Sequence, residues 1–217
     1  MYIILASGEA IVIDPHVSPD ADKFLSEGHV KTVSILLTHE HFDHTSGVNW
    51  LKEKYSCQLI CTEECAQRIA NKRNNRPLTL PFLKNSKEKQ PNTCQIEQSA
   101  WYECIADKTF QGEYSFVWHG HKLKLISAPG HTIGSCLIEL DQIYVFTGDS
   151  LIADSRIITR FPTGSHEDYE KFTLPYLQTI PSNSWIMPGH GKPFKKMDVV
   201  YSDGWYKSFN NTNVAVE

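Results

Sequence analysis

The sequence predicts an α/β domain in which β-sheets lie inside and helices lie outside. Short, β-branched apolar runs recur along the chain, and helix-like patterns stand between several of them. Hydrophobic residues make up 41% of the 217 residues, which is enough to bury a sizeable core without disulfides. We therefore expect a single domain over residues 1–217.

The first half of the chain is predicted to begin with a hairpin. Apolar runs at 2–5 and 10–13 are joined by the turn residues 7–9. Ser18 is a candidate N-cap before Pro19, Phe24 and Leu25 supply an apolar face, and Gly28 ends this helix. The other elements expected in this half are a strand at 33–37, a helix at 47–55, a strand at 58–61 and a helix that begins at Thr62 and carries Arg68, Lys72 and Arg73.

A polar stretch at 73–99 contains three prolines, and we interpret it as an irregular excursion because strand patterns resume after it. A helix is predicted at 165–180, with an interruption at Pro175 as one option. Residues 193–217 are expected to form a polar C-terminal tail. The strands predicted in this half are 116–118, 122–127, 135–140, 143–147 and 185–187.

Composition excludes several classes of protein. Lys and Arg total 21 and Asp and Glu total 25, so the net charge is −4 and we expect no nucleic-acid partner. No apolar run approaches the roughly 20 residues that span a bilayer, and no basic segment precedes the first apolar run. We therefore expect no membrane partner and no signal peptide. Six scattered cysteines are typical of reduced thiols, which predicts a cytoplasmic location.

Metal-ligand side chains are concentrated directly after the strand predicted at 33–37. His39, His41, Asp43 and His44 occupy four of six positions, and imidazole and carboxylate groups are the ligands that zinc and similar ions take. His39 and His41 alternate, so both can face one point, while Asp43 and His44 can face a second. The alternative is a solvated histidine cluster, which this density of ligand types disfavours.

Three later strands end in the same way, with a glycine and then a ligand side chain. These side chains are His131, Asp149 and His190. Ligands of layered α/β proteins bind beyond the carboxyl ends of strands, so we expect all seven ligands at one rim. A catalytic zinc takes about three protein ligands. Seven candidates therefore indicate two metal ions with one bridging carboxylate.

These motifs resemble the metallo-β-lactamase superfamily, in particular its small glyoxalase II-like hydrolases. The resemblance covers about residues 2–195 and rests on the segments 13–15, 39–44, 129–135, 147–150 and 188–191. It implies an αββα sandwich of the metallo-β-lactamase type, with an abbreviated N-terminal edge because relatives usually carry one or two strands before Tyr2. It also implies that Asp14 orders the metal loops without touching the ions. The implied ligands are His39, His41 and His131 for one ion and Asp43, His44 and His190 for the other, with Asp149 between them.

The resemblance implies a dinuclear metal-dependent hydrolase that cleaves a small thioester, ester or lactone through a metal-bound hydroxide. Asp43 and Asp149 are the expected catalytic residues, Asp43 by positioning the water and Asp149 by bridging. We expect two zinc ions, and iron or manganese suits the same ligands.

Three alternatives stay open. The first is a mononuclear iron oxidoreductase of the sulfur dioxygenase kind on the same fold, which would use the equivalents of His39, His41 or His131, and Asp149. The second is a binding domain that has lost its metals, which the intact ligand set disfavours. The third is a nuclease, which the acidic composition disfavours.

Features around the expected pocket bear on the substrate. Ile158 and Arg160 stand where glyoxalase-like members often show Gly-Arg-Thr-Asp-Leu-Pro. The segment 68–89 carries seven Lys or Arg residues against Glu88 alone. It is either a capture surface for an anionic small-molecule substrate or a solvated helix face and loop. The oligomeric state has no signature in the sequence.

Two further groups of ligand-type residues have simpler interpretations than a metal site. His119 and His121 fit a hairpin corner better than a metal-binding pair. Cys57, Cys61 and Cys65 fit buried small hydrophobic side chains.

Overall fold

The computed structural model describes residues 1–75 and 102–208. The chain divides into two compact units, Met1–Thr109 and Phe110–Glu217. Each unit combines a β-sheet with helices, as the predicted α/β class requires. That the units form one domain stays a prediction. The excursion predicted at 73–99 lies outside the described residues from residue 76 onward. Within the described stretches, no helix has the length and apolar character needed to cross a membrane.

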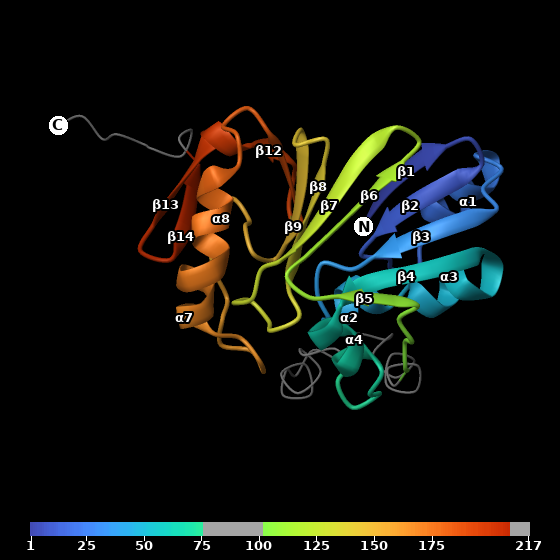
Figure 1. Ribbon diagram of the computed structural model, residues 1–217, viewed down its shortest axis with the longest axis horizontal. Coiled ribbons are helices and arrows are strands. Elements are labelled where there is room, and N and C mark those ends of the chain that lie inside the picture. Colours follow the sequence, from blue (N-terminus) through green and yellow to red (C-terminus); the bar gives the residue numbers. More distant parts are fainter. Residues whose placement is uncertain (76–101, 209–217) are drawn as a thin grey trace, which may run out of the picture. The chain divides into compact units, whose positions relative to one another are not determined.

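The first unit contains a five-stranded sheet in the order β1-β2-β3-β4-β5. β1 and β2 form the predicted antiparallel hairpin, whereas β2, β3 and β4 run parallel. Helices make the crossovers that parallel strands need, and Figure 1 shows α3 beside β4. The strands are β1 (Tyr2–Ala6), β2 (Glu9–Ile13), β3 (Thr32–Leu36), β4 (Ser56–Thr62) and β5 (Lys108–Phe110), and the helices are α1 (Pro19–Glu27), α2 (Phe42–Thr45), α3 (Val48–Lys54) and α4 (Glu63–Ile69).

Helix α1 begins as predicted. The Ser18 hydroxyl accepts a hydrogen bond from the Ala21 N–H at 3.3 Å, and Pro19 stands at the first helical position. Its apolar face is narrower than predicted, because Leu25 is fully buried while Phe24 is 49% exposed.

Helix α4 is shorter than predicted, which corrects the placement of two basic residues. It starts at the Thr62 cap but ends at Ile69, so Lys72 and Arg73 lie beyond it. The Asn71 side chain accepts a hydrogen bond from the Arg73 N–H at 3.0 Å, and such local bonds compete with helical ones.

The second unit contains a six-stranded sheet in the order β12-β11-β9-β8-β7-β6 and a three-stranded sheet in the order β10-β14-β13. All described pairs in the larger sheet are antiparallel except β9 with β11, which are parallel. The five strands predicted here from residue 116 onward are present. The strands are β6 (Glu113–Trp118), β7 (His121–Ser127), β8 (Cys136–Leu140), β9 (Tyr144–Gly148), β10 (Ser155–Arg156), β11 (Trp185–Pro188), β12 (Phe194–Lys195), β13 (Val199–Ser202) and β14 (Trp205–Ser208).

The helix predicted at 165–180 is present as a continuous segment with a change of type (Figure 1, orange). It comprises α7 (His166–Asp168), a π-helical turn (Tyr169–Thr173) and α8 (Leu174–Thr179). Pro175 falls in the first turn of α8, directly after the π-helical turn, at the point where the helix changes type. The proline therefore does not end the helix.

The prediction of an unpatterned tail is wrong for residues 194–208. β13 and β14 form a hairpin around Asp203-Gly204, and β10 pairs with β14. Tyr206 is only 1% exposed, and its hydroxyl lies 2.6 Å from that of Tyr169. The Asp-Gly turn signal is present in the sequence, but the strands beside it are only four residues long and show no clear alternation. Residues 209–217 of the tail lie outside the described residues.

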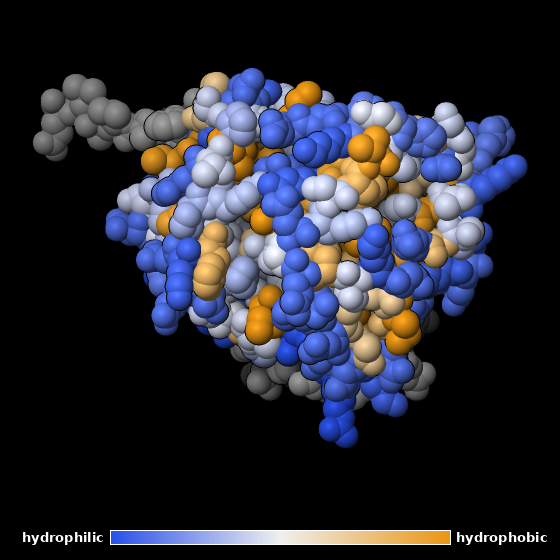
Figure 2. Space-filling view, in the orientation of Figure 1, coloured by the Kyte–Doolittle hydropathy of each residue, from blue (hydrophilic) through white to orange (hydrophobic). Residues whose placement is uncertain are grey.

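The face shown in Figure 2 is mostly hydrophilic, with hydrophobic residues in separate small patches. Isolated exposed apolar side chains of this kind are normal on protein surfaces.

Candidate metal centre

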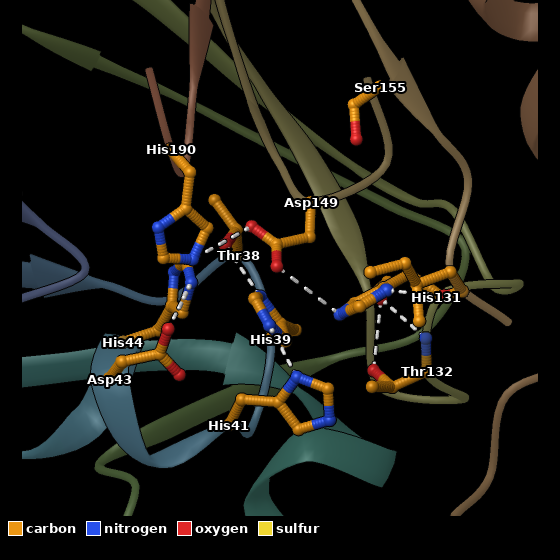
Figure 3. Close-up of polar contacts among 12 residues, drawn as sticks. Thr38, His39, His41, Asp43, His44, His131, Thr132, Asp149, Ser155 and His190 are labelled. Carbon is orange, nitrogen blue, oxygen red and sulfur yellow. Dashed lines mark hydrogen bonds and ion pairs between the residues drawn. The ribbon is translucent and has the colours of Figure 1, made fainter. Parts of the chain in front are cut away.

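The histidine motif of the first unit follows β3 at its carboxyl end. His39 is fully buried and His44 is 2% exposed. His39 Nε2 lies 3.0 Å from His41 Nδ1, and His44 Nε2 lies 3.6 Å from Asp43 Oδ2 (Figure 3). The motif therefore presents two pairs of candidate ligand atoms.

Asp14, directly after β2, organises this motif. It is 5% exposed and has a φ of 51°, a backbone conformation that aspartate tolerates better than most residues. Its carboxylate accepts hydrogen bonds from the Thr38 N–H at 2.7 Å and the Thr38 hydroxyl at 2.6 Å. Asp14 Oδ2 also lies 2.8 Å from His44 Nδ1. The carboxylate can only accept, so His44 carries its proton on Nδ1 and presents the Nε2 lone pair as ligand.

The same reasoning assigns the proton of His39. The Thr38 hydroxyl hydrogen is donated to Asp14, so its oxygen accepts from His39 Nδ1, which is 3.1 Å away. His39 Nε2 is then the ligand atom. Asp14 and Thr38 thus fix the ligand form of two imidazoles, a role that outer partners of metal-binding histidines commonly play.

The second unit contributes His131, Asp149 and His190. Asp149 Oδ2 lies 3.6 Å from His131 Nε2, and Asp149 Oδ1 lies 3.6 Å from His190 Nε2. Figure 3 shows the carboxylate between the two rings, one oxygen toward each. His131 Nδ1 lies 2.6 Å from the Ile158 carbonyl oxygen, which can only accept, so His131 also presents Nε2. A carboxylate in this position can serve two ions at once.

Parallel strands explain why Asp149 and His190 meet. β9 and β11 run parallel, so the residues that follow them emerge at the same edge of the sheet. The Gly189 N–H donates to the Gly148 carbonyl at 2.8 Å and fastens the two strand ends together. The glycine-ligand pattern at these two strand ends predicts that Asp149 and His190 lie close together.

Helix α2, which carries Asp43 and His44, is held from one side by Tyr102. The Tyr102 hydroxyl lies 2.7 Å from the Thr45 hydroxyl, and its ring contacts Phe42. Burial raises the pKa of the Tyr102 phenol, so this side chain stays neutral over the physiological range. No motif in the sequence marked Tyr102, because its partner lies 57 residues away.

The two other groups of ligand-type residues are the His119–His121 pair and the cysteines of the first unit. His119 and Gly120 form the turn between β6 and β7, and His121 Nδ1 lies 2.6 Å from Asp141 Oδ2. Cys61 and Cys65 are fully buried in the core of the first unit, as predicted, whereas Cys57 is only partly buried against it.

Only the start of the basic segment 68–89 is described. There the Arg68 guanidinium lies 3.1 Å from the carboxylate of Glu40, which is 4% exposed. Arg68 therefore compensates a buried charge next to the histidine motif. The rest of the segment lies outside the described residues from residue 76 onward.

The sequence pattern described as the metallo-beta-lactamase superfamily matches residues 1–190. The chain belongs to the metallo-β-lactamase superfamily. This confirms the resemblance and the fold class that the sequence predicted.

Relatives within this superfamily are similar at modest identity. The chain is 28% identical over 200 residues to a hydroxyacylglutathione hydrolase of Prochlorococcus marinus, covering 88% of this chain and 64% of the relative. It is 26% identical over 208 residues to a probable metallo-hydrolase of Methanocaldococcus jannaschii, covering 93% and 91%. Among solved structures, TTHA1623 in a di-iron-bound form has a TM-score of 0.66 at 19% identity, covering 90% of this chain and 89% of that one.

These names indicate a metallo-hydrolase. The chain spans 50 to 64% of the length of three hydroxyacylglutathione hydrolases that it matches. Superfamily members bind divalent metals, and the seven residues predicted as ligands stay a prediction for this chain.

Proposed function

We propose that this superfamily member is a dinuclear metal-dependent hydrolase of small thioesters, esters or lactones. The observation that carries the proposal is the Asp149 carboxylate, whose two oxygens face two different imidazoles. A carboxylate that binds a single ion does not require a second histidine next to its other oxygen.

The proposed ligand groups combine side chains of both units. His39, His41 and His131 would hold one ion, and Asp43, His44 and His190 would hold the other. Asp149 would bridge them. The donor set suits divalent metals, because His39, His44 and His131 each have Nδ1 engaged and Nε2 left as the donor atom. Two zinc ions are the proposed metals, and iron or manganese is the substitute.

The bound ions would make hydroxide available near neutral pH and would polarise the scissile carbonyl. The chain's own residues supply the rest. The Asp43 side chain is 55% exposed, so it can accept a hydrogen bond from water while it binds metal. Asp14 fixes the ring nitrogen of His44 that carries the proton, and Arg68 offsets the buried charge of Glu40. Asp43 and Asp149 are the proposed catalytic residues.

The proposed location is the cytoplasm. Cys57, Cys61 and Cys104 are thiols rather than disulfide partners, which supports a reducing compartment.

Metal analysis and one activity panel test the function. Protein purified without added metal is analysed for bound metals, then assayed anaerobically with zinc against small thioesters, esters and lactones. A parallel assay is run in air with iron and a persulfide donor. We expect two metal ions per chain and hydrolysis without oxygen. Oxygen consumption with the persulfide, together with no hydrolysis under any metal, would replace the proposal with the iron oxidoreductase.

A pair of variants tests the bridging role. Asp149→Ala should weaken both ions, because it removes a ligand from each and leaves positive charge uncompensated. His190→Ala should mainly weaken one. Metal stoichiometry after dialysis against a weak chelator measures the difference. Equal stoichiometry in Asp149→Ala and the unmodified protein would refute the bridge.

A further inference from the structure

A cavity of about 580 Å³ lies in the second unit, beside the loop that follows Asp149. Residues 154–160 form one wall, and His166, Gly204 and Trp205 form the other. This volume is within the range of small-molecule sites. Nothing in the proposed hydrolysis uses the cavity.

The side chains that line the cavity carry more positive than negative charge. Arg156 and Arg160 both line it, and within the described part of the chain neither guanidinium forms an ion pair. The one lining carboxylate, Asp154, accepts hydrogen bonds from the Ser208 N–H at 2.9 Å and the Ser208 hydroxyl at 3.0 Å. The Asp154 carboxylate therefore connects the residue before β10 to the end of β14. With no acidic partner among the described residues, each planar guanidinium group can donate paired hydrogen bonds to the oxygens of a carboxylate or phosphate.

The β10–β14 register sets the face of the sheet from which the Arg156 side chain leaves. Arg156 stands directly opposite Trp205 in the β10–β14 register, so both side chains leave the sheet on the same face. Gly204 lies next to the Arg156 side chain, since a Cβ there would be in ordinary van der Waals contact with Arg156 Nε at 3.7 Å. Trp205 and Ile158, 40% and 38% exposed, add apolar surface for the body of a ligand. The cavity therefore pairs an anion-binding corner with an apolar wall.

The cavity adjoins the metal ligands of the same unit. A smaller hollow of about 20 Å³ is lined by His131 and Asp149, and it shares four lining residues with the cavity, residues 155–158. Ile158 also accepts the hydrogen bond from His131 Nδ1. A molecule that reached from Asp149 into the cavity would place its far end at the arginines.

We propose that this cavity binds a carboxylate or phosphate group carried by the substrate at the end remote from the bond that is cleaved. The inference rests on the proposed function for the cleaved bond and adds the substrate class, which is an anionic thioester or ester. Arg156 and Arg160 then determine which substrates are preferred, and the cavity that they line contains no proposed metal ligand.

Binding of unreactive anions tests the cavity without any turnover. Glutarate and inorganic phosphate are titrated into the protein as purified, with uncharged glutaramide as the neutral probe, by calorimetry and by Trp205 fluorescence. A Trp205→Phe variant identifies the Trp205 signal. We expect one of the two anions to bind, glutaramide to bind at least tenfold more weakly, and Arg156→Gln or Arg160→Gln to weaken the anion about tenfold or more. The anion that binds tells carboxylate recognition from phosphate recognition.

Matched variants control for charge and for folding. Lys207→Gln removes one positive charge from the exposed face of β14 outside the cavity and should bind the anion as the unmodified protein does. Arg160→Lys keeps the charge but loses the fork, so it should bind more weakly than the unmodified protein. Thermal melts check each fold. Absence of anion binding, or equal binding by the double variant Arg156→Gln/Arg160→Gln and the unmodified protein, would overturn the proposal.

An activity arm separates this inference from the proposed function. The ratio of kcat/KM for a succinyl thioester to that for its neutral methyl ester should exceed ten and should fall about tenfold in Arg160→Gln. Hydrolysis of both thioesters at equal rates would support the hydrolase and refute the anion site. Anion binding without any hydrolysis would support the site and refute the hydrolase.

Discussion

At the scale of single residues, Asp14 joins three groups next to the proposed metal ligands. Its carboxylate holds the Thr38 N–H, the Thr38 hydroxyl and His44 Nδ1 within 2.6 to 2.8 Å. Asp14→Asn preserves the size of the side chain but replaces one acceptor oxygen with an NH₂ donor. At least one of these buried groups is then left without its acceptor, at a cost of about 1–3 kcal/mol for each such group.

We therefore expect Asp14→Asn to lower metal affinity about 10- to 100-fold, as is usual for partners of metal-binding histidines. Competition with a chromophoric chelator measures the affinity, and urea denaturation measures the stability. Asp20→Asn on the exposed first turn of α1 makes the same chemical change away from the site. Equal metal affinity in these two variants would contradict the role given to Asp14.

Sequence patterns revealed the ligand candidates but not the groups that orient them. His131 and Asp149 follow strand ends, and that relation is local along the chain. Their orientation depends on distant contacts, such as the carbonyl of Ile158, 27 residues from His131. A backbone carbonyl carries no residue-type signal, so no pattern could mark it.

At the scale of elements, the loop that carries His131 packs closely on the π-helical turn. Gly130 has a φ of 145°, and a Cβ there would lie 2.5 Å from Tyr169 Cβ. Gly130→Ala therefore combines a strained backbone with overpacking and should lower the free energy of unfolding by about 2 kcal/mol or more. Gly112→Ala is the matched control, since Gly112 also has a positive φ of 64° but has open space around it.

Urea denaturation compares the two glycine variants, and metal titration shows whether the displaced loop also weakens binding at His131. We expect Gly112→Ala to lose only the backbone term, roughly 1–2 kcal/mol. Similar losses in both variants would mean that contact with Tyr169 contributes nothing beyond the backbone term.

Asp107 connects α3 with β4 in the first unit. Its Oδ2 accepts hydrogen bonds from Lys52 Nζ and from the Leu59 N–H, both at 2.7 Å. Burial by itself raises the Asp107 pKa, but these two hydrogen bonds outweigh burial and lower it below the usual value. A lowered folded-state pKa stabilises the protein above the unfolded pKa of about 3.9, and this stability is lost as the pH falls through the folded pKa.

Asp107→Asn should therefore cost about 1 kcal/mol at pH 7, because the group is partly exposed, and less at pH 3. Urea denaturation at both pH values measures the difference. Glu103→Gln, an exposed acid in the same segment, should change stability little at either pH. If Asp107→Asn cost more stability at pH 3 than at pH 7, the assigned sign of the pH dependence would be wrong.

Most elements could be predicted because each has a local signal, such as the Ser18 cap of α1 or the apolar run of β7. The β13–β14 hairpin could not, because apolar residues such as Val200 and Trp205 face outward and its large anchor, Tyr206, is buried through a distant partner, Tyr169. Short edge strands gain their stability from such tertiary contacts rather than from propensity.

At the scale of the whole molecule, each compact unit has a core of its own. One core is built on the parallel strands of the first unit, and the other lies under the helical segment 166–179 of the second. The proposed ligands are divided between the units, with His39, His41, Asp43 and His44 in the first and His131, Asp149 and His190 in the second. Ions held by both sets would bind only when both units are folded.

Metal binding should therefore stabilise the two units together. A ligand that binds only the native state stabilises it by about 4 kcal/mol at a thousandfold excess over its Kd. With saturating zinc, slowly exchanging amides of β3 and of β8 should both gain protection by a similar factor, as hydrogen exchange measures it. His39→Ala in the first unit and Asp149→Ala in the second should each abolish most of this gain in both units. Protection confined to one unit would show that the ions belong to that unit alone, and the proposed division of ligands would have to be abandoned.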